Sequence, residues 1–108
     1  MKIVNLEAFR LLPPGTLYSK YKPCTFDGLM IKGQTWEHDF IYQDLIGNIE
    51  CTDSGDFCNK LDEALENSKS LGLDFDCMSR DGLFDEDQLF AIYEDEDVKG
   101  LIKRIQNY

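Results

Sequence analysis

The sequence predicts an α+β fold, with an antiparallel sheet of about 4–5 strands, two main helices packed on it and a short N-terminal helix. Residues 89–93 (Leu-Phe-Ala-Ile-Tyr) place large side chains on both alternating faces, as a strand in the middle of a sheet does. A helix over 95–106 follows, because Val98, Leu101, Ile102 and Ile105 have the i, i+3, i+4, i+7 spacing of one apolar face. A second helical pattern covers 53–71.

The N-terminal helix is predicted from its two ends. Asn5 is a suitable N-cap, and Leu6, Phe9 and Leu12 then line one side of a short helix. The run 13–15 (Pro-Pro-Gly) ends it, because proline cannot continue the helical hydrogen-bond ladder.

Three strands are expected next, over 17–22, 29–32 and 40–45. The dipeptide Asp27-Gly28 favours a turn between the first two, and residues 33–39 connect the second to the third. Together the three segments are typical of an antiparallel meander.

The 53–71 helix has caps at both ends in the sequence. Asp53 or Ser54 can cap its start, and Gly72 suits the left-handed residue after its end. The predicted inward stripe consists of Phe57, Leu61, Ala64, Leu65 and Ser68, whereas Asp62, Glu63 and Glu66 are expected to face water. Residues 73–78 fit a short strand or an ordered loop equally well.

The length of 108 residues predicts one domain, 1–108, with one hydrophobic core. The net charge of −10 argues against direct binding to nucleic acid or to an anionic membrane. Residues 1–36 hold five basic and two acidic residues, and the remainder holds six basic and 19 acidic ones. This asymmetry predicts a basic partner; solubility alone is the plain alternative.

No catalytic, cofactor or metal site is predicted. Four cysteines without a Cys-x-x-Cys pair predict a reduced, cytoplasmic protein with buried, inert thiols, although the even count permits disulfides. The region 74–87 is acidic, but aligning Gly82 with position 6 of an EF-hand loop puts Cys77 and Gln88 at ligand positions 1 and 12. The single histidine, His38, is expected in a solvated loop without a nucleophile.

The remaining candidate is an anionic surface for a partner protein. Two acidic runs flank the predicted 89–93 strand, and Trp36 is a candidate aromatic anchor, with Tyr42 as a second. The purely structural alternative is that 94–97 stabilises the positive end of the following helix. The predicted partner-binding residues are Asp81, Asp85, Glu86, Asp87, Glu94, Asp95, Glu96, Asp97 and Trp36.

Three stretches carry a resemblance to a known group. Residues 12–16 (Leu-Pro-Pro-Gly-Thr), 39–44 (Asp-Phe-Ile-Tyr-Gln-Asp) and 80–87 (Arg-Asp-Gly-Leu-Phe-Asp-Glu-Asp) resemble small acidic proteins of tailed phages and prophages. The resemblance implies no activity and no functional residues. It implies a context, because such proteins often bind and block host nucleases and defence complexes, as anti-CRISPR proteins do.

These observations favour a non-enzymatic, acidic inhibitor or modulator of a basic host or defence protein. A nucleic-acid-handling partner, blocked by DNA mimicry, is its sharpest version. Two alternatives stay open: a small enzyme or ligand- or metal-binding protein with a carboxylate-lined pocket, and an immunity or antitoxin protein. The expected location is the cytoplasm, that of the bacterial host if the protein is phage-encoded.

Overall fold

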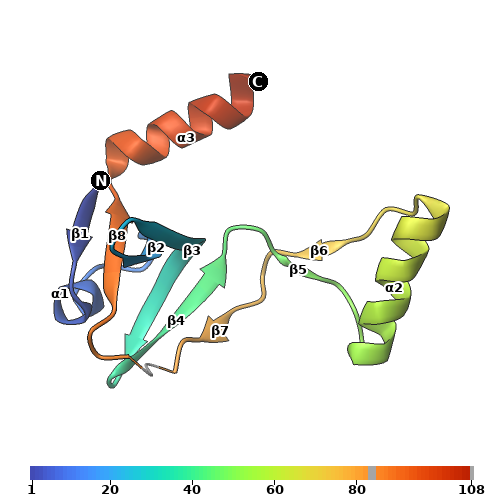
Figure 1. Ribbon diagram of the computed structural model, residues 1–108, viewed down its shortest axis with the longest axis horizontal. Helices are drawn as coiled ribbons and strands as arrows, with labels where there is room; N and C mark the ends of the chain where they lie inside the picture. The colour runs from blue at the N-terminus through green and yellow to red at the C-terminus, as the bar shows by residue number, and fades with distance from the viewer. Residues whose placement is uncertain (83–84, 108) are drawn as a thin grey trace. The chain divides into compact units, whose positions relative to one another are not determined.

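The computed structural model describes residues 1–82 and 85–107, so Leu83 and Phe84, inside the 80–87 resemblance, lie outside the described residues. The chain divides into two compact units. The first unit comprises 1–45 and the chain from Met78 onward, and the second unit is Ile46–Cys77 (Figure 1). The expectation of a single domain stays a prediction.

The first unit is built on a six-stranded antiparallel sheet, and the second contains a two-stranded one, which confirms the predicted α+β fold. The strand order of the larger sheet is β1-β8-β2-β3-β4-β7. Its strands are β1 (Lys2–Val4), β2 (Leu17–Lys22), β3 (Thr25–Trp36), β4 (Asp39–Asp44), β7 (Ser79–Arg80) and β8 (Leu89–Tyr93). The patterns did not predict β1 and β7, which are three and two residues long and therefore too short to show a period.

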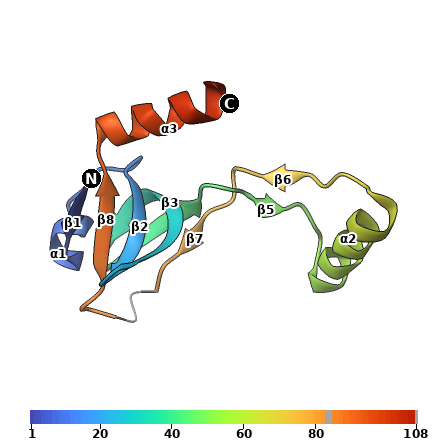
Figure 2. The ribbon, with the colours of Figure 1, turned by 45° about the horizontal axis from the view of Figure 1, so that its top comes forward.

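Strand β8 lies between β1 and β2, in the interior of the sheet as predicted (Figure 2). Ile92 pairs with Lys2 on one side and with Tyr18 on the other. The three central residues of the strand, Phe90 to Ile92, are buried.

The predicted turn at Asp27-Gly28 is wrong, because β3 runs through this dipeptide. The chain turns instead at Pro23-Cys24, where Cys24 has a φ of 64°. Gly28 has a φ of 73° inside the strand, opposite a register shift between Tyr18 and Lys20 of β2. The glycine therefore marks an irregularity within the strand rather than a hairpin loop.

The core of the first unit is an aromatic cluster beneath α1 (Leu6–Arg10). Asn5 caps this helix as predicted, since its Oδ1 accepts a hydrogen bond from Ala8 N at 2.9 Å. Phe9 is fully buried; its ring stacks on Phe90 at 4.0 Å between centroids and meets the rings of Tyr18 and Phe40 edge-on. The short helix thus supplies buried contacts of the kind that were predicted for the helices over 53–71 and 95–106.

The helix α3 (Asp95–Asn107) matches the predicted range, and it contacts β8 at its start. None of its described side chains is buried. Val98 and Leu101 are half-buried, whereas Ile102 and Ile105 are 47% and 67% exposed.

The second unit contains β5 (Asn48–Ile49), α2 (Ser54–Asn67) and β6 (Leu73–Asp74), and β5 pairs antiparallel with β6. Asp53 caps α2 by accepting a hydrogen bond from Asp56 N at 2.7 Å. The helix ends at Ser68, which adopts the left-handed conformation with a φ of 54°. The predicted extension to Leu71 with Gly72 as the left-handed residue is therefore wrong. Of residues 73–78, only Leu73 and Asp74, which form β6, belong to a strand.

No residue of the second unit is buried, so the predicted inward stripe of α2 lacks a cover within that unit. Phe57 and Leu61 are 39% and 38% exposed, and Leu65 is 84% exposed. The acids predicted to face water, Asp62, Glu63 and Glu66, are exposed.

Candidate partner-binding groove

The two acidic clusters lie at opposite ends of β8. Residues 85–87 precede this five-residue strand and 94–97 follow it, so its length of roughly 17 Å separates them. The structure therefore does not bring the two clusters together into one row of carboxylates.

In the later cluster, Glu94 and Asp97 hold an ammonium group. The N-terminal nitrogen of Met1 lies 2.6 Å from Asp97 Oδ2 and 3.3 Å from Glu94 Oε1. The hydrogen bond to this ammonium lowers the pKa of Asp97, and the same bond raises the pKa of the Met1 amine. Asp97 also accepts a hydrogen bond from Glu94 N at 2.9 Å, at the start of the helix. These two carboxylates are therefore already in contact with a cation of the same chain.

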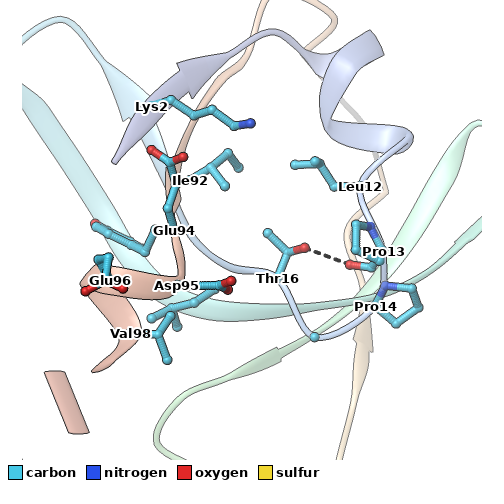
Figure 3. Close-up of a pocket in the computed structure, with 13 residues that line it drawn as sticks. Lys2, Leu12, Pro13, Pro14, Thr16, Ile92, Glu94, Asp95, Glu96 and Val98 are labelled. Atoms are coloured by element: carbon cyan, nitrogen blue, oxygen red, sulfur yellow. Dashed lines mark hydrogen bonds between the residues drawn. The ribbon is translucent and has the colours of Figure 1, made fainter. Parts of the chain in front are cut away.

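A groove of about 530 Å³ lies next to this cluster in the first unit (Figure 3). One wall is the start of α3, where Asp95 directs its carboxylate toward the Thr16 side of the groove. The opposite wall follows the end of α1, where Thr16 Oγ1 donates a hydrogen bond to Pro13 O at 2.7 Å. The full lining is Lys2, Leu12, Pro13, Pro14, Gly15, Thr16, Leu17, Ile92, Tyr93, Glu94, Asp95, Glu96 and Val98.

The groove combines an apolar lining with an excess of negative charge. Three carboxylates and one ammonium, that of Lys2, are among its charged groups. Lysine and arginine side chains suit such a surface, because their methylene stems pack on apolar groups while the charged head reaches a carboxylate. The arrangement can therefore bind a basic segment that also has apolar side chains.

The earlier cluster, residues 85–87, does not line this groove. Asp85, Glu86 and Asp87 are exposed, and Asp85 Oδ1 accepts a hydrogen bond from Asp87 N at 2.9 Å. Asp81 is different, because its side chain is 9% exposed and forms an ion pair with Lys20 at 2.8 Å. Asp81 is thus engaged within the sheet.

Trp36 is exposed, but it takes part in an internal contact. The guanidinium of Arg80 lies 4.7 Å from the centre of its ring, and Arg80 Nε donates a hydrogen bond to Asp39 Oδ2 at 2.6 Å. Burial acts to raise the pKa of Asp39, but hydrogen bonds from Arg80, Phe40 N and Gly82 N outweigh it and lower this pKa. Asp39 was not among the predicted residues, and no local pattern identifies it, since Arg80 is 41 positions away.

Two further buried polar side chains belong to the core. Lys32 is 1% exposed; its Nζ donates hydrogen bonds to Gly33 O at 3.1 Å and Thr35 Oγ1 at 2.9 Å, and burial lowers its pKa. Burial also raises the pKa of Tyr18. Because both side chains are inaccessible, they do not contribute to a binding surface.

Among residues 1–82 and 85–107, no group of three or more His, Cys, Asp or Glu side chains could hold a metal ion. The prediction that the cysteines are buried is wrong. Three of them (Cys24, Cys51 and Cys58) are exposed and Cys77 is half-buried. His38 is exposed in the turn before β4, as expected.

Three carboxyls, those of Asp39, Asp56 and Asp97, have a pKa clearly below the ordinary range. For Asp56 the main cause is the hydrogen bond from Thr52 N. A lowered pKa is typical of carboxyls in ion pairs and helix caps, whereas a general acid requires a raised pKa.

None of the described helices is long and apolar enough to cross a membrane.

Comparison of the chain with protein-family models, curated proteins and solved structures finds no match.

Proposed function

We propose that this protein is a non-enzymatic binding protein that engages a basic segment of another protein and thereby inhibits or modulates it. The observation that carries the proposal is the 530 Å³ groove, with Glu94, Asp95 and Glu96 beside an apolar lining. The net charge of −10 supports it, because an acidic surface attracts a basic partner and speeds its association.

The partner's chemistry follows from the groove. A segment with alternating basic and apolar side chains places ammonium or guanidinium groups at the Asp95 wall and apolar groups on Leu12 and Val98. Proteins that handle nucleic acid carry such basic segments, so a nucleic-acid-handling host or defence protein is the sharpest version of the proposal. The separation of the clusters along β8 means that this version relies on one cluster rather than on a continuous row.

The test uses the full chain and a fluorescent peptide of alternating lysine and leucine, with a glutamate–leucine peptide as the negative probe. One variant carries Asp95→Lys and Glu96→Lys, and the matched control carries Asp85→Lys and Glu86→Lys at the other end of β8. Both variants have a net charge of −6, so a general electrostatic attraction falls equally in the two. We expect the groove variant to lose roughly tenfold or more in affinity, which corresponds to about 1.4 kcal/mol, and the control to lose much less.

Equal losses in the two variants would remove the groove as the site. Circular dichroism must show that both variants are folded, because reversing acids in the first turn of a helix costs about 0.3–1 kcal/mol each. A pull-down from host lysate, with and without nuclease and competing DNA, then addresses the partner. Recovery of a nucleic-acid-handling protein that DNA displaces supports the mimicry version.

A further inference from the structure

The apolar stripe of α3 is half-buried at Val98 and Leu101 and exposed at Ile102 and Ile105. No described residue of this helix is buried, and Ile102 and Ile105 are 47% and 67% exposed. The helix contacts the sheet through β8 at its start and then extends from the end of that strand (Figure 2). In a soluble protein, a stripe at this spacing normally packs against another element, and an exposed one marks an interaction surface.

The charges along α3 are polarised. Asp95, Glu96 and Asp97 occupy its first turn, whereas Lys103 and Arg104 lie near its end. A second copy of the same helix that packs antiparallel places each acidic end beside a basic end. Parallel packing would place like charges together, so the helix is electrostatically complementary to itself only in the antiparallel orientation.

The flank of the stripe makes this complementarity specific. Asp97 and Arg104 are seven residues apart, so they lie on the same flank of the helix, next to Leu101. In an antiparallel pair of helices, equivalent flanks face each other, and Asp97 of one copy then faces Arg104 of the other. In its own chain, Asp97 Oδ2 also contacts the Met1 ammonium and Glu94 N, so Arg104 of the second copy would add a further cation to this carboxylate. Twofold symmetry forms this ion pair twice.

A second groove, of about 480 Å³, adds apolar surface on the same flank. Leu17, Leu29 and Tyr93 of the sheet line it together with Leu101 and Arg104 of the helix. A partner helix on the stripe extends over this surface as well. Because one pair of short helices buries a small area, the resulting dimer belongs to the weak class that dissociates on dilution.

We propose that α3 is the contact surface of a homodimer, in which it packs antiparallel on α3 of a second copy. This proposal rests on the stripe and on the charge order of the helix, and it does not depend on the proposed function.

The test is the mass in solution of the full chain, by sedimentation equilibrium in about 0.15 M salt, where repulsion between the acidic copies is screened. Over protein concentrations from about 10 µM to about 1 mM, we expect the mass to rise from 12.5 kDa toward twice that value. Ile105→Asp is expected to keep the chain monomeric throughout, because it places a charge in the stripe. Arg104→Glu is expected to weaken the dimer about tenfold or more, and Arg104→Lys to retain it.

The matched control is Leu65→Asp on α2, where the native side chain is 84% exposed. It adds the same charge as Ile105→Asp but leaves the proposed interface intact, so the dimer should persist. A wild-type chain that stays monomeric at about 1 mM overturns the proposal. A dimer that Ile105→Asp and Arg104→Glu leave unchanged overturns it as well, and so does a dimer that Leu65→Asp dissociates equally. Both Asp variants replace exposed side chains, and circular dichroism verifies that they are folded.

Discussion

The two compact units of this chain differ in how far their apolar side chains are buried. In the first unit, Phe9, Tyr18, Phe40 and Phe90 are each at most 1% exposed and form one cluster. In the second unit no residue is buried, although α2 has an apolar face at helical spacing. An amphipathic pattern therefore predicts that a face exists, but it does not predict what covers that face.

The charges of the two units differ as well. The second unit holds eight acids and two lysines among its 32 residues, a net charge of −6. Both lysines are in ion pairs with acids of the same unit, Lys60 with Asp56 and Lys69 with Glu63. With few apolar contacts and excess like charge, we expect this unit to open locally at a lower free energy than the first.

The largest expected effect breaks the core of the first unit. Phe9→Ala should lower the free energy of unfolding by about 3–5 kcal/mol, because it removes the ring at the centre of the aromatic cluster. Phe57→Ala removes the same side chain from α2, where it is 39% exposed, and should cost about 1 kcal/mol or less. Urea denaturation followed by circular dichroism measures both, and equal losses would contradict the contrast between the units.

The next effect concerns the buried carboxylate of the first unit. Asp39→Ala should cost about 2 kcal/mol, because Arg80 and the backbone N–H groups of Phe40 and Gly82 lose their acceptor. The pKa of Asp39 is lowered in the folded protein, so its contribution is complete above its unfolded pKa of about 3.9 and is lost as the pH falls through the folded value.

The pH dependence provides the check for this prediction. In Asp39→Asn, the part of the acid-induced loss of stability that belongs to Asp39 should disappear, as measured by denaturation at a series of pH values below about 5. Asp44, at the other end of β4, is exposed, and Asp44→Asn serves as the control. The prediction fails if the two variants have the same pH profile.

Two tyrosines of the first unit should respond differently to the loss of their hydroxyl groups. The buried hydroxyl of Tyr18 has no hydrogen-bond partner within the described part of the chain, so Tyr18→Phe should leave stability unchanged or raise it by about 1 kcal/mol. The hydroxyl of Tyr93 lies 2.8 Å from Ser19 Oγ, which itself donates a hydrogen bond to Gly28 O. Tyr93→Phe should therefore cost about 1 kcal/mol in the same denaturation assay. Losses of equal size in both variants would argue against this assignment.

The smallest expected effect lies in the second unit. Leu65 is 84% exposed, so Leu65→Ser should change the free energy of unfolding by less than about 0.5 kcal/mol. The same thermal or urea scan measures it. A loss of about 2 kcal/mol or more would show that another part of the protein covers this face.

Local patterns predicted where helices and strands form better than they predicted which segments pair with one another. Asn5 as a cap, β8 as an interior strand and the range of α3 were all confirmed, because each depends on adjacent residues. The turn expected at Asp27-Gly28 was wrong, since a glycine with positive φ fits a strand irregularity as well as a hairpin. Long-range pairing decided between the two.

The site was less predictable than the fold. The residues of both acidic runs were identified from composition, but their separation follows from the position of β8 between them. The groove depends on the approach of the Pro13–Thr16 segment to the start of α3, and these residues are about 80 positions apart in the chain. Asp39 was missed for the same reason, because Arg80, its partner, lies on another strand.

Native-state hydrogen exchange on the full chain tests the central contrast most directly. We predict that the amides of β8 and β2 exchange only through global unfolding, because both strands are paired on two sides in the sheet. The amides of α2, and Glu50 N, which is bonded to Gly72 O at 3.0 Å, should exchange through local opening at a much lower free energy. Equal protection of α2 and β8 would contradict the account, because it would mean that the apolar face of α2 is covered and folds together with the core.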